Sequence, residues 1–491
     1  MNSRYWCFLF LVVSASSKGW NDVKTSCPRI LFIPFPARSH ILWQLDLAKE
    51  LKERNFDVIA ALETTYLKLA NSADVTAYDL GYSANDPIRG AEVLSNSKVN
   101  EEHLCATLNS MEPKEFDKNV LPCLILSHDR QEASIRQSLM GAIEHAHPAL
   151  IVTDYNCNYV KSTAERLGIP YVEMHSAVPM GDPTYFAAAI GTTRPNFLQR
   201  FLTKTLCLLN DVCRSIVLGW DIPQLPWKRP STRAAATVYG LFKGLHYPIE
   251  HPLPPSHVLV GYPIKSSTLK DDGLKSWLDD IDTVVYVSFG SHVNPTCRTL
   301  GEIARGAVAV STTAHVLLST RRREHCSIRT STRIRIESWV DQRSVVAHSA
   351  VRAIVTHGGT VGLMEAVYAH KPVLVIPYWA DQPVNAFLAF ERGLGLTLHK
   401  DNVTEISVRE TIRALLTDWK RYADTAKAMD QVRRLSGGVE KGANAIEMAL
   451  LLTKPNSASH QRRAAGALPL VLSLALAYVL YRAIAVCRDW K

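Results

Sequence analysis

Short apolar runs alternate with longer amphipathic stretches along most of the chain. The runs, rich in Ile, Val and Leu, lie at residues 30–33, 149–153, 284–287, 316–318, 353–355 and 373–376. Continuous apolar runs of this length are typical of strands that are buried on both faces of a parallel sheet. After the first run, Ile41, Leu45, Ala48 and Leu51 recur at helical spacing. The repeated order of strand, loop and helix therefore predicts an α/β protein with parallel sheets.

A proline-rich stretch divides this pattern into two comparable halves. The prolines stand at positions 248, 252, 254, 255 and 263, and neither a helix nor a strand accommodates them at such density. We expect an interdomain linker at 251–263, between an N-terminal domain at 18–250 and a C-terminal domain at 264–455. The 491 residues alone suggest about three domains of about 150 residues, so the pattern favours fewer and larger ones.

Both ends of the chain have the character of targeting segments. Residues 1–17 combine Arg4, an apolar stretch and a run of small residues, which is typical of a cleaved signal peptide. Residues 464–481 carry no charge and are long enough for a transmembrane helix, with a tail at 482–491. The alternatives are a buried first element and a buried C-terminal helix. We expect a single-pass protein of the endoplasmic reticulum membrane, with its body in the lumen and its tail in the cytosol.

Composition and charge exclude several classes of protein. With 47% apolar and 21% charged residues, the chain is globular and neither disordered nor polytopic. The net charge of +9 comes mainly from six arginines at positions 321, 322, 323, 329, 333 and 335. No aromatic side chains are interleaved with them, so a nucleic-acid surface is not predicted. A solvated loop is favoured, although Arg333 to Ile336 alternates like a strand.

Chemically versatile side chains follow several of the predicted strands. His40 comes after the first strand, and Asp154 directly follows the run at 149–153. Ser291, His357 and Asp381 follow later strands in the same way. In open parallel sheets ligands bind beyond the carboxyl ends of the strands, so we expect these residues to line a site.

The C-terminal half contains the elements of a nucleotide site. His357-Gly358-Gly359 leads into a helix at 361–369, where glycine allows close approach and free N–H groups attract an anion. Trp339 can stack on a flat base, Gln342 can hydrogen-bond its edge, and Glu365 can bind ribose hydroxyls. Taken alone, such glycines are more often just a tight turn, Trp339 a core aromatic and Glu365 a surface charge of a helix. Together they indicate a nucleoside diphosphate.

These residues belong to a longer pattern that resembles the UDP-glycosyltransferase signature, particularly that of the animal-type, ER-anchored glucuronosyltransferases. It reads Val355-Thr-His-Gly-Gly-Thr-Val-Gly-Leu-Met-Glu365-Ala, with Lys371-Pro372 and Pro377-Tyr-Trp-Ala-Asp381-Gln382 downstream. The likeness continues in Trp339 to Gln342 and in Val285-Tyr-Val-Ser-Phe-Gly-Ser291. The resemblance implies a GT-B fold, in which two Rossmann-like domains face a cleft. The N-terminal domain would bind the acceptor, and the C-terminal domain would bind the UDP-sugar.

The resemblance also implies a role for each matching residue. Trp339 and Gln342 would hold uracil, and Glu365 would hold ribose. The diphosphate would be lined by Ser291, His357, Gly359 and Gly362. Asp381 and Gln382 would bind the hydroxyls of the donor sugar.

His40 matches the family's general base, and Asp154 matches its orienting acid. An imidazole suits proton abstraction near neutral pH, and a carboxylate on its far nitrogen fixes the tautomer. The resemblance therefore implies an inverting transfer of a hexose or hexuronic acid to a hydroxyl of a small lipophilic acceptor. The UDP-sugar is a co-substrate, and no cofactor is expected.

Two positions depart from the family pattern near the donor. Val361 stands where the family usually has Asn, and Ser319-Thr320 stands where it has Trp followed by Arg or Lys. An alternative function is therefore a membrane-anchored UDP-sugar-binding protein with impaired catalysis.

Two further enzyme classes have weaker support. An NAD-type oxidoreductase lacks its glycine fingerprint, because Arg38-Ser-His40 follows the first strand. Asp280-Ile-Asp282 formally matches a metal-binding DxD but precedes a strand instead of following one, so no metal is predicted. The oligomeric state stays open, a homo-oligomer included.

Overall fold

The computed structural model describes residues 28–81, 137–155, 157–177, 234–246, 254–290, 293, 295–320, 328, 331–378 and 381–453. The predicted signal peptide at 1–17, the predicted span at 464–481 and the tail at 482–491 lie outside these residues, as does Ser291. Among the described helices, none is long and apolar enough to cross a membrane.

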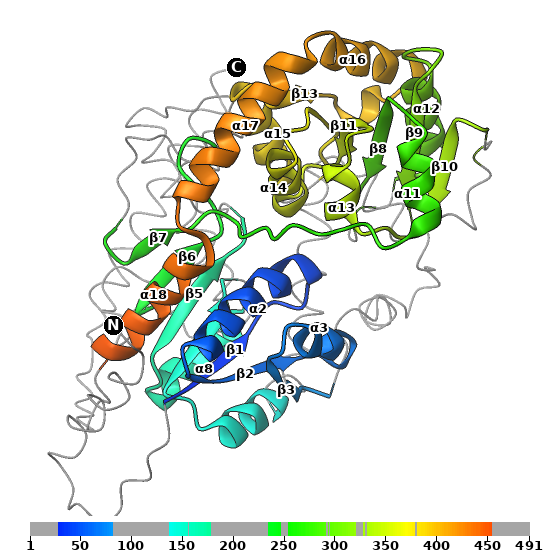
Figure 1. Cartoon of the computed structure of the whole chain (residues 1–491). Helices are drawn as coiled ribbons and strands as arrows, with labels where there is room; N and C mark the ends of the chain where they lie inside the picture. The colour runs from blue at the N-terminus through cyan, green and yellow to red at the C-terminus, as the bar shows by residue number, and fades with distance from the viewer. Residues whose placement is uncertain are drawn as a thin grey trace, which may run out of the picture.

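The N-terminal sheet has seven parallel strands in the order β3-β2-β1-β4-β5-β6-β7 (Figure 1). They are β1 (Arg29–Ile33), β2 (Asp57–Leu62), β3 (Thr76–Asp79), β4 (Leu150–Asp154), β5 (Tyr171–His175), β6 (Ala236–Tyr239) and β7 (His257–Leu259). Its named helical segments are α2 (Arg38–Glu53), η2 (Thr64–Tyr66), α3 (Leu67–Ser72) and α8 (Asn158–Leu167). The predicted apolar face of α2 is confirmed, since Ile41, Leu45, Ala48 and Leu51 are all buried.

The C-terminal sheet has six parallel strands in the order β10-β9-β8-β11-β12-β13. They are β8 (Val284–Ser288), β9 (His315–Ser319), β10 (Ile334–Glu337), β11 (Val351–Thr356), β12 (Val373–Val375) and β13 (Gly395–Thr397). The helical segments are α11 (Asp272–Asp279), α12 (Cys297–Val308), α13 (Gln342–Ala347), α14 (Thr360–Tyr368), α15 (Gln382–Glu391), η4 (Lys400–Asn402), α16 (Glu405–Thr417), α17 (Trp419–Leu435) and α18 (Gly438–Leu452). The two parallel sheets confirm the predicted α/β class, and every apolar run that predicted a strand overlaps one.

Where it is described, the arginine-rich segment is not a solvated loop. Arg333 directly precedes β10 and Arg335 lies within it, as the alternating pattern indicated. The Arg333 guanidinium donates to the carbonyl of Ser311 over 3.0 Å, and Arg335 pairs with Glu337 over 2.8 Å. These two cations therefore support local structure, whereas the other four arginines of the cluster lie outside the described residues.

The predicted linker begins too early. Residues 257–259 form β7, the edge strand of the first sheet, so the prolines at 254 and 255 precede a strand that their density seemed to exclude. The chain crosses between the two sheets after β7. Gly261 has φ +69, and a Cβ there would lie 2.4 Å from the carbonyl oxygen of Arg433. Only glycine therefore fits where the crossing segment passes the end of α17.

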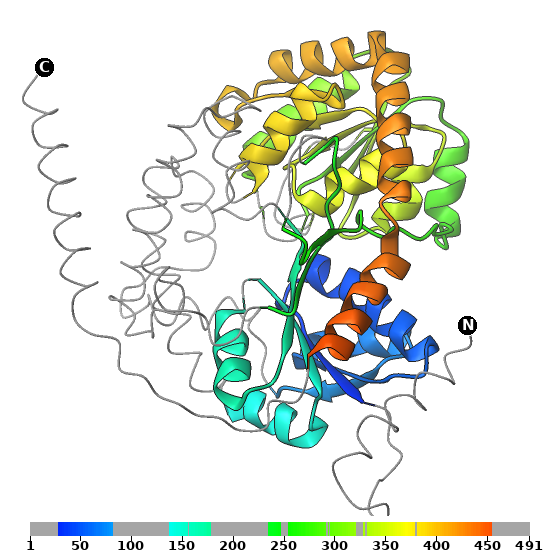
Figure 2. The same cartoon turned by 90° about the vertical axis from the view of Figure 1, so that its left-hand side faces the viewer.

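The end of the chain returns to the N-terminal half, so the predicted domain boundary at 455 does not follow the packing. Helix α18 lies against α2 (Figures 1 and 2). The small residues Gly442 and Ala443 allow this approach, since a Cβ on Gly442 would lie 2.6 Å from Leu47. Ala443 and Ile446 join the same buried cluster as Trp43. The first domain thus includes α18.

Candidate active site

A histidine–aspartate pair stands at the carboxyl edge of the first sheet. β1 leads into α2, whose first turn carries His40, and the neighbouring β4 ends at Asp154. The His40 Nδ1 lies 2.7 Å from Asp154 Oδ2. Asp154 is fully buried, whereas 16% of the His40 side chain is exposed. Because a carboxylate only accepts, Nδ1–H donates to Asp154, which leaves Nε2 as the basic nitrogen.

The electrostatics of His40 involve both sheets. Burial favours the neutral imidazole, but the charge and hydrogen bond of Asp154 outweigh it and raise the pKa of His40 above its usual value. The charge of Asp381, from the loop before α15, adds to the rise. A residue of the C-terminal half therefore acts electrostatically on the candidate base of the N-terminal half.

Gln44 is a third member of this group that the sequence pattern missed. It lies one helical turn after His40 on α2 and is buried. Its Nε2 donates over 3.4 Å to the same Asp154 oxygen that His40 contacts. The signal was the spacing of four residues from His40, which places both side chains on one face of the helix.

Gln342 and Glu365 come together as the nucleotide prediction requires. Gln342 begins α13 and Glu365 lies on α14, and Gln342 Nε2 donates to Glu365 Oε2 over 2.6 Å. The Gln342 carbonyl oxygen accepts from the Tyr286 hydroxyl over 3.1 Å. Trp339 precedes α13 and is 67% exposed. Its indole is therefore accessible for stacking on a base, and it is not the core aromatic that its residue type alone suggests.

The glycines around His357 leave room for its ring. A Cβ on Gly359 would lie 2.6 Å from the imidazole, and a Cβ on Gly290 would lie 2.8 Å from it. Gly359 is the N-cap of α14, so the ring stands beside the free N–H groups of a helix N-terminus. A Cβ on Gly362 would lie 3.7 Å from Gln342 Nε2, which places this glycine next to the Gln342 amide.

Asp381 and Gln382 are held at the start of α15. Asp381 Oδ2 accepts from Thr360 Oγ1 over 2.8 Å and from Asn385 Nδ2 over 2.8 Å. The Gln382 side-chain oxygen accepts from the Tyr378 backbone N–H over 2.9 Å, and Gln382 is buried. Asp381 is thereby tied to the first residue of α14, next to the His357 turn. Among the described residues, no group of three or more His, Cys, Asp and Glu could hold a metal ion.

Comparison with known proteins indicates the class of protein to which this chain is similar. A family model described as UDP-glucoronosyl and UDP-glucosyl transferase matches residues 266–434. UDP-glycosyltransferase 75B1 of Arabidopsis thaliana is 27% identical over 81% of this chain and 91% of its own length. UDP-glucuronosyltransferase 2A3 of Cavia porcellus is 22% identical over 60% of this chain and 59% of its own length. The solved structure of the spinosyn forosaminyltransferase SpnP has a TM-score of 0.60 at 18% identity, over 87% of this chain and 100% of that one.

Two parallel-sheet domains of this kind define the GT-B fold of glycosyltransferases. The comparisons confirm the resemblance to UDP-glycosyltransferases, and the chain is an enzyme of that class.

Proposed function

We propose that the enzyme transfers a hexose or hexuronic acid, with inversion, from a UDP-sugar to a hydroxyl of a small lipophilic acceptor. The observation that carries this proposal is the His40–Asp154 pair, which stands at a sheet edge within the electrostatic reach of Asp381. A buried carboxylate bonded to one imidazole nitrogen leaves the other nitrogen to accept a proton.

The proposed reaction is a single displacement. His40 Nε2 accepts the acceptor's hydroxyl proton while the hydroxyl oxygen forms a bond to the anomeric carbon of the sugar. The bond from that carbon to the UDP oxygen breaks, and UDP leaves with the electron pair. Asp154 stabilises the imidazolium that forms, and the N-terminus of α14 at Gly359 favours the negative charge of the leaving diphosphate.

The donor would lie along the carboxyl edge of the second sheet. The exposed Trp339 indole is proposed to stack on uracil, and Gln342 and Glu365 to hold the base and ribose. His357, Gly359, Gly362 and Ser291 are proposed to line the diphosphate, and Asp381 and Gln382 to bind sugar hydroxyls. Support comes from Asp381, whose Oδ2 is already anchored by Thr360 and Asn385, so a bound sugar meets a carboxylate of fixed orientation.

The test is UDP release by the full chain in membranes, with a panel of UDP-sugars and lipophilic alcohols. We expect turnover with at least one donor and a loss of about 100- to 10,000-fold in His40→Ala, with UDP affinity retained. His145→Ala is the matched control, because His145 is an exposed histidine of the same domain. Unchanged turnover in His40→Ala would reject the base assignment. UDP binding without turnover of any donor would favour the alternative of a binding protein, to which the Val361 departure points.

We also propose that the enzyme is a single-pass protein of the endoplasmic reticulum membrane with a lumenal body. The support is the sequence of residues 1–17 and 464–481, which combine a signal-like start with an uncharged stretch of membrane-spanning length. A lipophilic acceptor would partition into the same membrane.

A further inference from the structure

Glu365, the proposed ribose ligand, is a buried carboxylate whose two oxygens are both occupied. Only 6% of the residue is exposed. Its Oε2 accepts from Gln342, and its Oε1 accepts from Arg343 Nε over 3.2 Å. Burying a carboxylate is costly unless a cation compensates for the lost hydration. Arg343, which directly follows Gln342 on α13, is the cation that forms an ion pair with it.

Arg343 retains a donor that no described protein group uses. Its Nη2 is buried and has no hydrogen-bond partner within the part of the chain that the structure describes. A buried N–H without an acceptor is unfavourable, so native structures rarely keep one without reason. This donor belongs to the guanidinium that contacts the proposed ribose ligand. The orphaned donor therefore marks this place as one where a ligand binds, while the Nε of the same guanidinium holds Glu365.

The groups that act on Glu365 come from several elements. Burial raises the pKa of Glu365, while the charge of Arg343 and the hydrogen bonds from Gln342 and Arg343 oppose the rise. Asp341, the N-cap of α13, raises it further. Two neutral hydroxyls lie nearby. Tyr286 on β8 donates to Gln342, and Tyr262 on the crossing segment interacts electrostatically with Glu365. Arg343 is thus the cation whose charge acts against the protonation of Glu365.

We propose that Arg343 is a positioning residue that keeps Glu365 ionised and oriented, so that the carboxylate accepts hydrogen bonds from the ribose hydroxyls of the UDP-sugar. The proposal rests on the proposed function, because it requires Glu365 to contact the donor. A protonated Glu365 has one oxygen converted into a donor and binds two ribose hydroxyls less well.

The experiment measures UDP affinity by titration calorimetry between pH 6 and 9 on the full chain. In Arg343→Met we expect affinity to fall by about 10- to 100-fold at pH 7, the value of one or two charge-assisted hydrogen bonds. The affinity should recover towards pH 9, because removal of Arg343 raises the proton affinity of Glu365 and alkaline pH restores the carboxylate. Arg343→Lys should keep most of the affinity. In steady-state assays the KM for the UDP-sugar should rise while kcat at saturation stays near that of the parent enzyme.

Two controls separate this inference from the proposed function. Arg409→Met removes a surface arginine of the same domain and should leave UDP affinity unchanged. Glu365→Gln should weaken UDP binding at every pH. If it does not, Glu365 is not a ligand, and the ribose assignment and the role of Arg343 fail together, whereas the transfer reaction is decided by His40→Ala. If Glu365→Gln weakens binding but Arg343→Met has no effect, or an equal effect at every pH, only the role of Arg343 is overturned. Arg343→Gln, which keeps polarity without charge, replaces Arg343→Met if the latter does not fold.

Discussion

His40 and Asp154 act as one unit, because Asp154 determines the proton affinity of His40. The hydrogen bond and the charge of Asp154 raise the pKa of His40 against the effect of burial. A base works only when it is unprotonated, so activity should fall as the pH drops through this raised pKa. The acid limb of the pH profile should therefore lie above the value for an ordinary histidine, about 6.5.

Asp154→Asn tests this coupling. The substitution removes the charge that raises the pKa of His40, so the acid limb of kcat/KM should move to lower pH. The maximal rate should also fall by about 100-fold or more, since an amide no longer stabilises the imidazolium. The measurement is kcat/KM between pH 5 and 9 with the best donor. An acid limb that keeps its position in Asp154→Asn would show that another group controls it.

Some residues of the candidate site could be predicted from the sequence pattern, and others could not. His40, Asp154, Gln342 and Glu365 were predictable, because they stand in a motif or at the end of an apolar run. Gln44 and Arg343 were not, because a polar residue on a helix is usually solvated. Their partners become evident only when α2 brings Gln44 to Asp154 at the end of β4 and α13 packs against α14.

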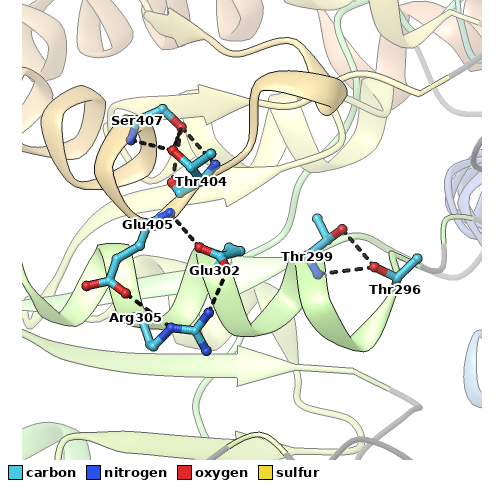
Figure 3. A network of polar contacts seen from close by, with 7 residues as sticks. All are labelled: Thr296, Thr299, Glu302, Arg305, Thr404, Glu405 and Ser407. Atoms are coloured by element: carbon cyan, nitrogen blue, oxygen red, sulfur yellow. Dashed lines mark hydrogen bonds and ion pairs between the residues drawn. The ribbon is translucent and has the colours of Figure 1, made fainter.

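At the scale of elements, α12 and α16 are joined by polar contacts as well as by packing. Glu302 accepts from the first backbone N–H of α16 over 2.8 Å, and Arg305 links Glu302 to Glu405 (Figure 3). The side chain of Thr404 caps the same helix end, in a capping box with Ser407. The axes approach because Gly306 has no side chain between them.

Gly306→Ala should therefore destabilise the C-terminal domain. The new Cβ would lie 2.6 Å from the Glu405 carbonyl and 2.8 Å from Val408 Cβ, and both belong to α16, so the helix must shift. Overpacking of this kind costs about 1–3 kcal/mol of unfolding free energy. Denaturant unfolding measures it. Gly301→Ala is the matched control on α12, because its Cβ would meet only the flexible end of Arg305 at 3.0 Å. Equal stability of the two variants would contradict the argument.

Three of the strands that the apolar runs did not predict have identifiable physical reasons. β5 contains Glu173 and His175, whose side chains pair with each other over 2.5 Å and so interrupt the apolar pattern. β3 is an edge strand with no buried residue. β7 is three residues long and follows two prolines. The apolar runs thus identified interior strands alone, and they missed these two edge strands and a strand with internally paired polar side chains.

At the scale of the whole molecule, the two halves are held together by the crossing segment and by the last two helices. Arg433 on α17 donates to the carbonyl of Tyr262 over 2.8 Å and is paired with the buried Asp430. The Tyr262 hydroxyl donates in turn to the carbonyl of Ser39, next to His40. The helix that carries the proposed base is thus bonded to a segment that α17 fixes. No apolar period in the sequence indicates this arrangement, because it depends on hydrogen bonds between distant segments.

The proposed lumenal orientation of the body predicts a modification at Asn402. Asn402-Val403-Thr404 is a glycosylation sequon, and Asn402 is exposed on η4, with no side-chain hydrogen bond to any described residue. In cells with a secretory pathway, peptide N-glycosidase should increase the gel mobility of the full chain. Asn402→Gln should abolish the shift, and Thr404→Ser, which keeps both sequon and helix cap, should retain it. Because the Thr404 hydroxyl is engaged in the capping box, we expect the glycan to be added before α16 folds. If peptide N-glycosidase does not change the mobility of the parent enzyme, Asn402 never meets the lumenal transferase. The proposed orientation would then be wrong.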